Sequence, residues 1–311
     1  MIKYFYKSLR DETVQELDKP QRDRGIWIHA ESLAPSEIED LAQRFGIDPG
    51  YLEDALDEDE MPRLEFEGDQ GYMFVRFAYK DADGDMDTAP LLIVFDAEFL
   101  MTVSPVNVPA VDALLKGKTS FTTTQRTKLI LLILTYISDK YQSSISLTSR
   151  KIKDIRYRLR NQGIINQDFI DFATIEDELS EFMSSLQPTN ATLRRLLAGR
   201  QLQMFEEDQD IVEGLLLNND QSIEAISANL RSIANIREAY SAINANNLNR
   251  TLTILTVATI VISLPSFAIG VYSMNIHLPY QQTNWIFPVI LAFNVFLMAS
   301  VVYVARKKRV F

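Results

Sequence analysis

The sequence contains no cysteine and only two histidines, His29 and His277. Without thiols the chain can form neither disulfides nor thiolate metal sites. A tetrahedral zinc cage needs several Cys or His ligands, and one chain cannot supply them. No nucleophile and base pair, phosphate-binding glycine loop or paired acid site stands out either. We therefore predict that the protein is not an enzyme.

A second absence divides the chain into two parts. From Thr251 to Ala305 there is no Asp, Glu, Lys or Arg, whereas the residues before Thr251 carry all 42 acidic residues and all but four of the 31 basic ones. An acidic body lacks the basic face that a phosphate backbone requires, which argues against a nucleic-acid partner. The N-terminal "MIKYFYKSLRDETVQ" lacks the apolar core of a secretory signal, so we expect residues 1–250 to stay in the cytoplasm.

The uncharged part contains two segments long enough to cross a bilayer, which takes about 20 apolar residues. They are "LTILTVATIVISLPSFAIGVY" (Leu252 to Tyr272) and "WIFPVILAFNVFLMASVVYVA" (Trp285 to Ala305). Two such helices in succession would be unusual in a soluble core. We predict transmembrane helices over 251–273 and 285–305, joined by a loop over 274–284 and followed by a basic tail over 306–311.

Positive charge gives the orientation, because cytoplasmic loops carry an excess of Lys and Arg. Arg237 and Arg250 precede the first span and the "RKKR" tail (Arg306 to Arg309) follows the second, while the loop between the spans has no charge. We expect a multi-pass protein of the cell membrane with both termini in the cytoplasm.

Residues 1–120 read as a small cytoplasmic α/β domain. Short β-rich runs alternate with turn signals, and "APSEIEDLAQRFG" has Pro35 near a helix start and Gly46 just past its end. The β-rich runs are "GIWIHA", "RLEFE", "GYMFVRFAY", "LLIVFDA" and "EFLMTVS".

Residues 121–250 are long and helical, with few breakers, and predict a helical bundle and stalk. The last helix runs from about Asn219 into the first span, which at 1.5 Å per residue makes a rod of about 80 Å. The fold class expected is an α+β membrane protein: an N-terminal α/β domain, a long helical stalk and two C-terminal transmembrane helices.

The first span carries a stripe of small and polar residues on one helical face. Such a stripe allows close helix packing in lipid, or it forms the wall of an aqueous pore, and spacing alone leaves both open. A pore would need several copies around an axis, so this alternative predicts a homo-oligomer. The second span, with Asn294, Ser300 and Tyr303, has no continuous stripe and would be the outer helix. The stripe comprises Glu238, Ala242, Ala245, Asn249, Leu252, Thr256, Thr259, Ser263, Ser266, Gly270 and Ser273.

Three further patterns have both a structural and a functional interpretation. The run Asp81 to Asp87 resembles a calcium loop, but its glycine is misplaced and the final acid is missing, so we predict a hairpin tip. The acidic run Glu53 to Glu60 is more typical of a solvated face than of a metal site. Pro265 inside the first span is either structural or a hinge.

Taken together, the residues resemble the CorA type of divalent-cation transporter, whose members end in two membrane helices joined by a Gly-Met-Asn loop. The corresponding piece here is "YSMNIHLP" (Tyr272 to Pro279). The likeness continues through "WIHAESLAPSEIEDLAQRFGIDPGYLEDALDEDEMPRLEFEGDQGYMFVRF" (27–77), through "EAYSAINANNLNRTLTILTVATIVISLPSFAIGVY" (238–272) and through the basic tail, and so covers nearly the whole chain.

The resemblance implies a homopentameric funnel that moves Mg²⁺ through a pore lined by the first membrane helix, with Mg²⁺ both transported and regulatory. It implies a selectivity filter at Asn275, with Met274 and Ser273 in the same motif. Leu252 and Leu255 would form an apolar constriction, with Asn249 below it and Glu238 at an acidic stalk position. The remaining pore-lining positions would be Thr256, Thr259, Ser263, Ser266 and Gly270.

Two departures from the family pattern affect the expected function. The family's glycine is Ser273 here, which costs backbone freedom wherever φ > 0 or close approach is needed. Pro279 is followed by Tyr280 where many members carry an acid, so attraction of cations to the mouth should be weaker. The alternatives are a Zn²⁺, Co²⁺ or Ni²⁺ transporter of the same fold, and a non-conducting membrane-anchored oligomeric sensor or scaffold.

Overall fold

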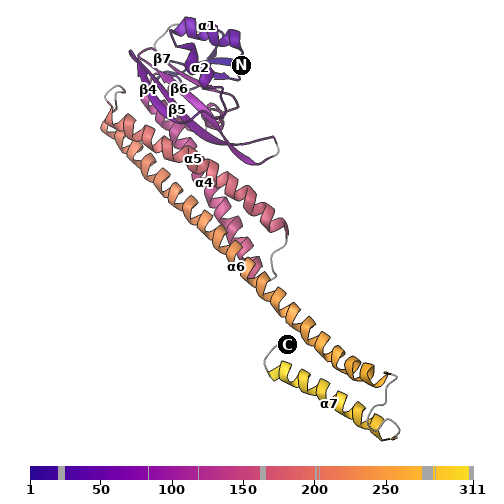
Figure 1. The fold of residues 1–311 in the computed structure, drawn as a ribbon. Helices are drawn as coiled ribbons and strands as arrows, with labels where there is room; N and C mark the ends of the chain where they lie inside the picture. The colour runs from indigo at the N-terminus through magenta and orange to yellow at the C-terminus, as the bar shows by residue number, and fades with distance from the viewer. Residues whose placement is uncertain are drawn as a thin grey trace. The chain divides into compact units, whose positions relative to one another are not determined.

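The computed structural model describes residues 1–19, 25–82, 84–117, 119–161, 166–199, 202, 204–274, 283 and 285–307. The chain forms two compact units, Met1–Ala234 and Asn235–Phe311. Helix α6 (Glu206–Tyr272) contributes residues to both (Figure 1).

The first unit is built on a seven-stranded sheet of order β2-β1-β3-β7-β6-β5-β4. Neighbouring strands are antiparallel except β3 and β7, which are parallel. The five predicted β-rich runs are confirmed as β3 to β7, whereas β1 and β2 were not predicted. The strands are β1 (Ile2–Tyr6), β2 (Gln15–Leu17), β3 (Ile26–Glu31), β4 (Arg63–Glu67), β5 (Gln70–Lys80), β6 (Met86–Phe95) and β7 (Phe99–Ser104).

Helix α1 (Pro35–Phe45) confirms the helix predicted from its end signals. Pro35 occupies the first turn, where its missing N–H is not needed. The Glu37 carboxylate accepts a 2.8 Å hydrogen bond from the backbone N–H of Ala34. Gly46 ends the helix at φ 66°, a left-handed conformation that favours glycine. With α2 (Pro49–Asp54), α1 buries its apolar side against one face of the sheet.

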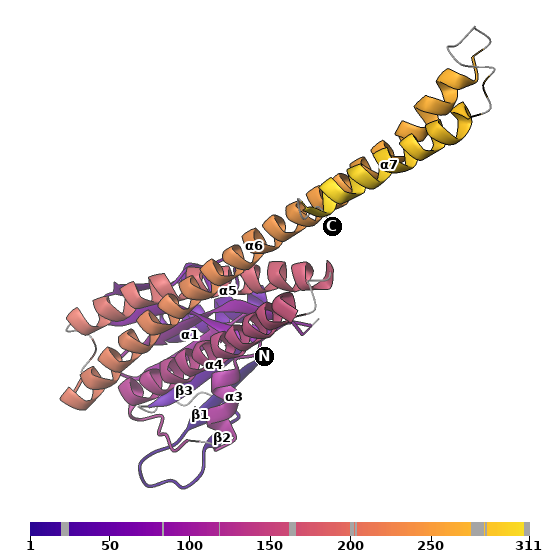
Figure 2. The ribbon, with the colours of Figure 1, turned by 90° about the horizontal axis from the view of Figure 1, so that it is seen from below.

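The other face of the sheet carries the long helices. α4 (Arg126–Asn161) contacts β5, and α5 (Asn166–Ala198) contacts β4, β5 and β6; the short α3 (Pro109–Leu115) contacts α4. Figure 2 shows α4, α5 and the first part of α6 running side by side. The first part of α6 therefore lies against α4 and α5.

Buried amides join these three helices. Ser138 of α4 donates a 2.8 Å hydrogen bond to Oδ1 of Asn219 on α6, and Nδ2 of Asn219 donates a 3.0 Å hydrogen bond to Oδ1 of Asn190 on α5. All three side chains are buried. Because a slip along any one helix would leave a buried amide without its partner, these bonds fix the register of α6.

Helix α6 begins earlier than the sequence predicted, at Glu206 rather than near Asn219. Its first turn holds Glu206, Glu207 and Asp208, whose negative charges suit the positive end of the helix dipole. The Asp208 carboxylate also accepts a 3.0 Å hydrogen bond from the backbone N–H of Phe205. The second unit is completed by α7 (Ile286–Lys307), which lies beside the end of α6 (Figure 1).

Candidate functional site

The end of α6 and the whole of α7 are the two described helices that are long and apolar enough to cross a membrane. No residue in the most apolar window of α6 is buried. A core helix of a soluble protein would be covered by its own chain, and this one is not. The two predicted spans therefore coincide with two apolar, uncovered helices.

Every predicted pore-lining position on α6 is exposed on the single chain. The apolar pair Leu252 and Leu255 is 51% and 62% exposed, although the side chains are large and hydrophobic. The other exposed positions are Glu238, Asn249, Thr256, Thr259, Ser263, Ser266 and Gly270. The whole stripe is thus exposed on one chain.

The hydroxyl groups of the stripe all donate to their own helix. Thr256 bonds the Leu252 carbonyl at 2.8 Å, and Thr259 bonds the Leu255 carbonyl at 2.9 Å. In the same way, the Ser263 hydroxyl donates to the Thr259 carbonyl at 2.7 Å, and the Ser266 hydroxyl donates to the Ile262 carbonyl at 2.9 Å. A hydroxyl has one proton and two lone pairs, so a group whose proton is committed to the backbone presents an acceptor outward. The stripe is therefore a row of neutral hydrogen-bond acceptors.

The opposite side of α6 is the side that is partly covered. The half-buried residues recur at helical spacing and lie on the side of α6 away from the stripe. The helix that lies beside this segment is α7 (Figure 1). On α7, the described residues Asn294 and Ala305 are buried. The second helix thus covers the apolar side of the first and leaves the hydroxyl side open. The half-buried positions of α6 are Val257, Val261, Leu264, Pro265, Ala268 and Val271.

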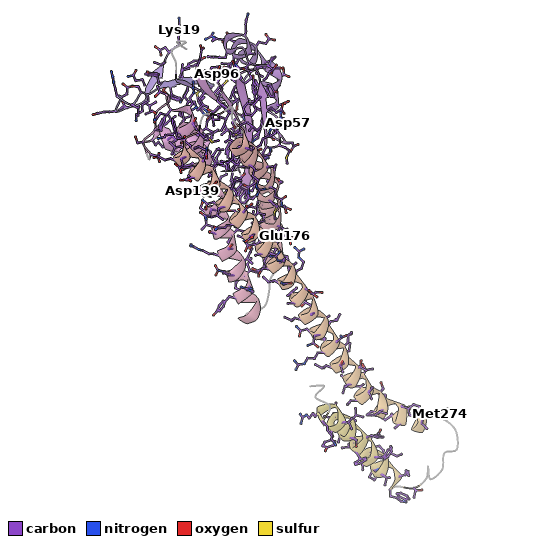
Figure 3. All side chains as sticks on the ribbon, turned by 90° about the vertical axis from the view of Figure 1, so that its left-hand side faces the viewer. Lys19, Asp57, Asp96, Asp139, Glu176 and Met274 are labelled. Atoms are coloured by element: carbon purple, nitrogen blue, oxygen red, sulfur yellow. The ribbon has the colours of Figure 1, made fainter. Side chains whose placement is uncertain are left out.

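Ser273 and Met274 lie just past the end of α6. The backbone N–H of Ser273 bonds the Ile269 carbonyl at 2.9 Å, and its hydroxyl bonds the Gly270 carbonyl at 2.9 Å. Among the described non-glycine residues Ser32 has a positive φ and Ser273 does not, so a serine fits this backbone without strain. Met274 is 51% exposed (Figure 3). Asn275, the predicted filter residue, lies outside the described residues, as does the rest of 275–282.

Within the described part of one chain, no group of three or more His, Asp or Glu side chains is placed to hold a metal ion. Instead, residues of the acidic run Glu53 to Glu60 form ion pairs and hydrogen bonds with arginines. Asp54 pairs with Arg63 at 2.7 Å, Glu60 pairs with the same guanidinium, and Arg76 donates to the carbonyls of Glu58 and Glu60 at 2.6 and 3.0 Å. In the single chain this run is therefore the end of α2 and an ordered loop after it.

The run Asp81 to Asp87 is confirmed as a hairpin tip. Lys80 at the end of β5 is paired with Met86 at the start of β6, and the Asp81 carboxylate accepts a 2.9 Å hydrogen bond from the backbone N–H of Asp85. Asp81 is therefore used within the turn.

Sequence reasoning missed a charged cleft of about 840 Å³ between this hairpin, α4 and α5. Glu178 lies in its wall, where burial raises the pKa of the carboxyl above 4.5, against the opposing effects of Lys151 and of a 3.3 Å hydrogen bond from Thr148. The sequence did carry a signal: the second half of α4 is basic and the first half of α5 is acidic, as expected for antiparallel neighbours such as Arg158 and Asp168, which form an ion pair.

Sequence reasoning also missed a buried arginine. Arg76 is 6% exposed and donates through all three guanidinium nitrogens, including a 3.1 Å contact with Glu181 of α5. Its partners come from the acidic loop, from β6 and from α5, so it joins the sheet to the helical layer. In the sequence it is one charged residue inside an apolar strand.

These features define a class of protein: the two-span membrane proteins with a large N-terminal portion. The N-terminal portion is an α/β sheet unit with a layer of long helices, and the chain ends in two helices of membrane length, one of which carries an exposed hydroxyl stripe. Within this class, the chain belongs to the CorA-like Mg²⁺ transporter protein family, whose sequence model matches residues 22–307.

Individual relatives cover almost the whole chain. The cobalt/magnesium transport protein CorA of Methanocaldococcus jannaschii is 22% identical in an alignment of 301 residues that covers 91% of this chain and 90% of the relative. The complete structure of the CorA magnesium transporter from the same organism has a TM-score of 0.86 at 21% identity and covers 98% of this chain and 97% of its own.

More distant structures share the fold. The full-length CmaX protein has a TM-score of 0.78 at 17% identity over 97% of both chains. The ZntB cytoplasmic domain from Vibrio parahaemolyticus has a TM-score of 0.63 at 12% identity and covers 78% of this chain and 98% of its own.

These likenesses confirm the family that the sequence resembled and its fold: an N-terminal α/β domain, long helices and two C-terminal apolar helices. Membership of a transporter family also confirms the prediction that the protein is not an enzyme.

Proposed function

We propose that this protein carries Mg²⁺ across the cell membrane as a homo-oligomer, a pentamer, in which the stripe on α6 lines a central aqueous path. The observation that carries the proposal is the arrangement of α6: α7 covers its apolar side, and its uncharged acceptor side is exposed, with no partner among the described residues of one chain. A polar face that one chain leaves open in a bilayer needs either water or other copies. A ring of copies supplies both.

The stripe suits a hydrated cation. Mg²⁺ releases its water reluctantly, so the groups that meet the pore wall are water O–H donors. The back-bonded hydroxyls of Thr256, Thr259, Ser263 and Ser266 offer acceptors to those donors without replacing them. Leu252 and Leu255 would close the same path by excluding water, with Asn249 and Glu238 beyond them toward the cytoplasm.

We place ion selection at the outer mouth. Asn275 follows Ser273 and Met274 directly in the sequence, and five side-chain amides in a ring would accept hydrogen bonds from the water shell of the ion. A neutral ring binds weakly enough for release. With both termini in the cytoplasm, the membrane potential would drive uptake with about 2.3 kcal/mol per charge per 100 mV.

Cytosolic Mg²⁺ would also regulate the path. The body of the chain is acidic, so carboxylates of neighbouring subunits would face one another, and a bound divalent cation would offset their repulsion. Glu238, which is exposed on α6, is a candidate for this contact between subunits.

Cobalt is the second candidate ion, because the printed name of the Methanocaldococcus jannaschii relative gives cobalt together with magnesium. Its presence in the transported set would not change the path through the protein, since the acceptor stripe contacts water rather than metal.

Uptake into proteoliposomes containing a Mg²⁺-sensitive dye tests the proposal. Purified wild-type protein should admit Mg²⁺, and external Co²⁺ should compete. Entry of transition metals without Mg²⁺ would assign the chain to a different ion, and no flux from intact oligomers would indicate a sensor or scaffold.

Asn275→Ala tests the assigned filter. Removing the amide ring should abolish selective uptake while the oligomer, measured by light scattering, stays assembled. Uptake and selectivity equal to wild type would contradict the role of Asn275.

A further inference from the structure

The C-terminal end of α4 concentrates positive charge in an otherwise acidic protein. Residues 150–160, "RKIKDIRYRLR", contain six basic residues and one acidic residue, Asp154, although the whole chain has a net charge of −11. The first half of α5, which is acidic, lies next to this segment. The basic residues therefore divide into those that face α5 and those that do not.

Two of the basic residues are directed toward α5. Arg158 forms an ion pair with Asp168. Lys151 lines the charged cleft between α4 and α5, together with Glu178 of α5. The charge on this side of α4 is thus matched by acidic residues of the same chain.

Another side of the helix carries a second basic group. Arg150, Lys153 and Arg156 recur at every third position, so they lie on neighbouring parts of the helix surface. All three are exposed, and among the described residues no acidic partner is recorded for them. Arg150 lies at the rim of the cleft, and Lys153 and Arg156 are not in its lining. With Tyr157, which is 68% exposed, these residues form what we call the outer face of α4.

Two hydrogen bonds show the direction in which α4 runs. Ser138 of α4 bonds Asn219 of α6, and further along both helices Nδ2 of Asn229 donates a 2.8 Å hydrogen bond to the Ser149 hydroxyl. Residue numbers rise together along the pair, so α4 and α6 are parallel. The outer face of α4 therefore lies at the end of the first unit from which α6 continues toward its membrane span.

We propose that the outer face of α4 binds anionic phospholipid headgroups of the membrane that the chain spans. The charges are complementary, because a guanidinium forms paired hydrogen bonds with a phosphate and each Lys or Arg near an anionic membrane surface strengthens binding about five-fold. A tyrosine among basic residues is typical of a segment at the membrane interface, where its ring contacts apolar groups and its hydroxyl contacts water.

An acidic face on a second copy of the chain would also match the charge of the outer face. It would give no reason for this face to lie at the end of the unit where α6 leaves for the membrane, whereas a lipid surface does. Headgroup binding would attach the first unit to the membrane at a second place besides α6.

A fluorescent probe at the outer face tests the proposal. The chain has no cysteine, so Tyr157→Cys gives a single site for a bimane label. The labelled full-length protein is reconstituted into phosphatidylcholine vesicles with or without phosphatidylglycerol, each containing a lipid with a quenching nitroxide on its headgroup. Quenching should be at least about two-fold stronger with phosphatidylglycerol, and the difference should disappear at high salt, which screens exposed charges.

Neutralising the outer face should have the same effect as salt. The variant combines Arg150→Gln, Lys153→Gln and Arg156→Gln in the labelled background and should quench equally in both kinds of vesicle. Because the three side chains are exposed, its circular dichroism should match that of the parent protein.

The matched control combines Lys116→Gln, Lys128→Gln and Arg194→Gln, which remove three exposed basic residues elsewhere in the first unit. It changes the net charge equally and should keep the dependence on phosphatidylglycerol. Equal quenching of the parent protein in both kinds of vesicle, or a dependence on phosphatidylglycerol that the outer-face variant retains, would overturn the proposal.

A second copy as the partner would give a different result. The outer-face variant would then dissociate the oligomer in detergent, measured by light scattering, and quenching would not depend on phosphatidylglycerol, which would also overturn the proposal. The quenching measurement needs no transport. Absence of Mg²⁺ uptake by the wild type would therefore refute the proposed function without deciding whether the outer face binds lipid.

Discussion

The two units of this chain differ in whether their polar side chains find hydrogen-bond partners within one chain. In the first unit, Arg76 is buried and its guanidinium is bonded at all three nitrogens, and the amides of Asn190 and Asn219 bond each other. In the second unit, the hydroxyls of Thr256 and Thr259 are exposed, and among the described residues no donor is recorded to their oxygens. These buried groups of the first unit find their partners within one chain, whereas the hydroxyl stripe of the second unit does not.

Apolar residues repeat the difference. Trp27 in the first unit is 0% exposed, whereas Leu255 in the second is 62% exposed. In water such a helix would expose a large apolar surface, but lipid removes that cost. The bilayer covers the apolar side of α6 and α7, so the polar stripe is the part for which we propose other copies and water as partners.

The largest expected effect comes from breaking the first unit at Arg76. Arg76→Met removes the donors that hold the carbonyls of Glu58, Glu60 and Thr88, and the carbonyl of the buried Thr88 is left without its partner. We expect a loss of about 3 kcal/mol in the free energy of unfolding, measured by chemical denaturation of the full-length protein with circular dichroism.

Arg194→Met is the control for that change. Arg194 contacts Asp220 at 3.4 Å, and both side chains are more than half exposed, so the loss should stay below about 1 kcal/mol. Similar losses from both variants would contradict the special role of the buried arginine.

An intermediate effect, on Mg²⁺ uptake, should come from Thr259→Val on the stripe. Thr253→Val is its matched control. Both threonines are exposed and both donate to the carbonyl four residues earlier, at 2.9 and 2.7 Å, but Thr253 lies about a quarter turn from the centre of the stripe. Loss of one acceptor toward the water shell should reduce Mg²⁺ uptake about five-fold, equivalent to about 1 kcal/mol.

The variant off the stripe, Thr253→Val, should change Mg²⁺ uptake less than about two-fold in the same dye measurement, because its additional methyl group would contact lipid. Equal effects at both positions would remove the distinction between the two faces of α6, and with it the main support for the proposed path.

The smallest effect concerns pH. The folded-state pKa of Glu178 is raised above 4.5 by burial, so the folded protein binds this proton more tightly than the unfolded chain does. The stabilisation is present below pH 4.5 and is lost as pH rises through the folded pKa. Glu178→Gln should therefore raise the melting temperature at pH 7 and leave it unchanged at pH 4.

Asp177 is an exposed carboxylate on the same helix, so Asp177→Asn is the control for this measurement. A gain from Glu178→Gln that is the same at both pH values would show that burial of the charge is not its cause.

Much of the fold could be predicted because its signals are local. The absence of charge from Thr251 to Ala305 predicted both spans, and Pro35 with Gly46 predicted the limits of α1. The stripe on α6 followed from helical periodicity alone, since every third or fourth residue of a helix shares a face. The family and the exposed stripe were thus within reach of the sequence.

What sequence reasoning missed depends on contacts between distant residues. Arg76 and Glu181 are 105 positions apart, and Ser138 and Asn219 are 81 apart, so no local pattern connects them. β2 has three residues, too few to show an alternation.

The back-bonded hydroxyls of α6 have one more consequence. From Thr251 to Val271 no side chain gains or loses a proton at physiological pH, so the wall of the proposed path would keep the same electrostatic character in acidic and alkaline surroundings. It would also present oxygen lone pairs to an entering ion, which would repel chloride and phosphate and accept hydrogen bonds from the water around a cation. Charge discrimination here would come from the direction of dipoles, and acidification could alter permeation only by acting on groups elsewhere in the protein.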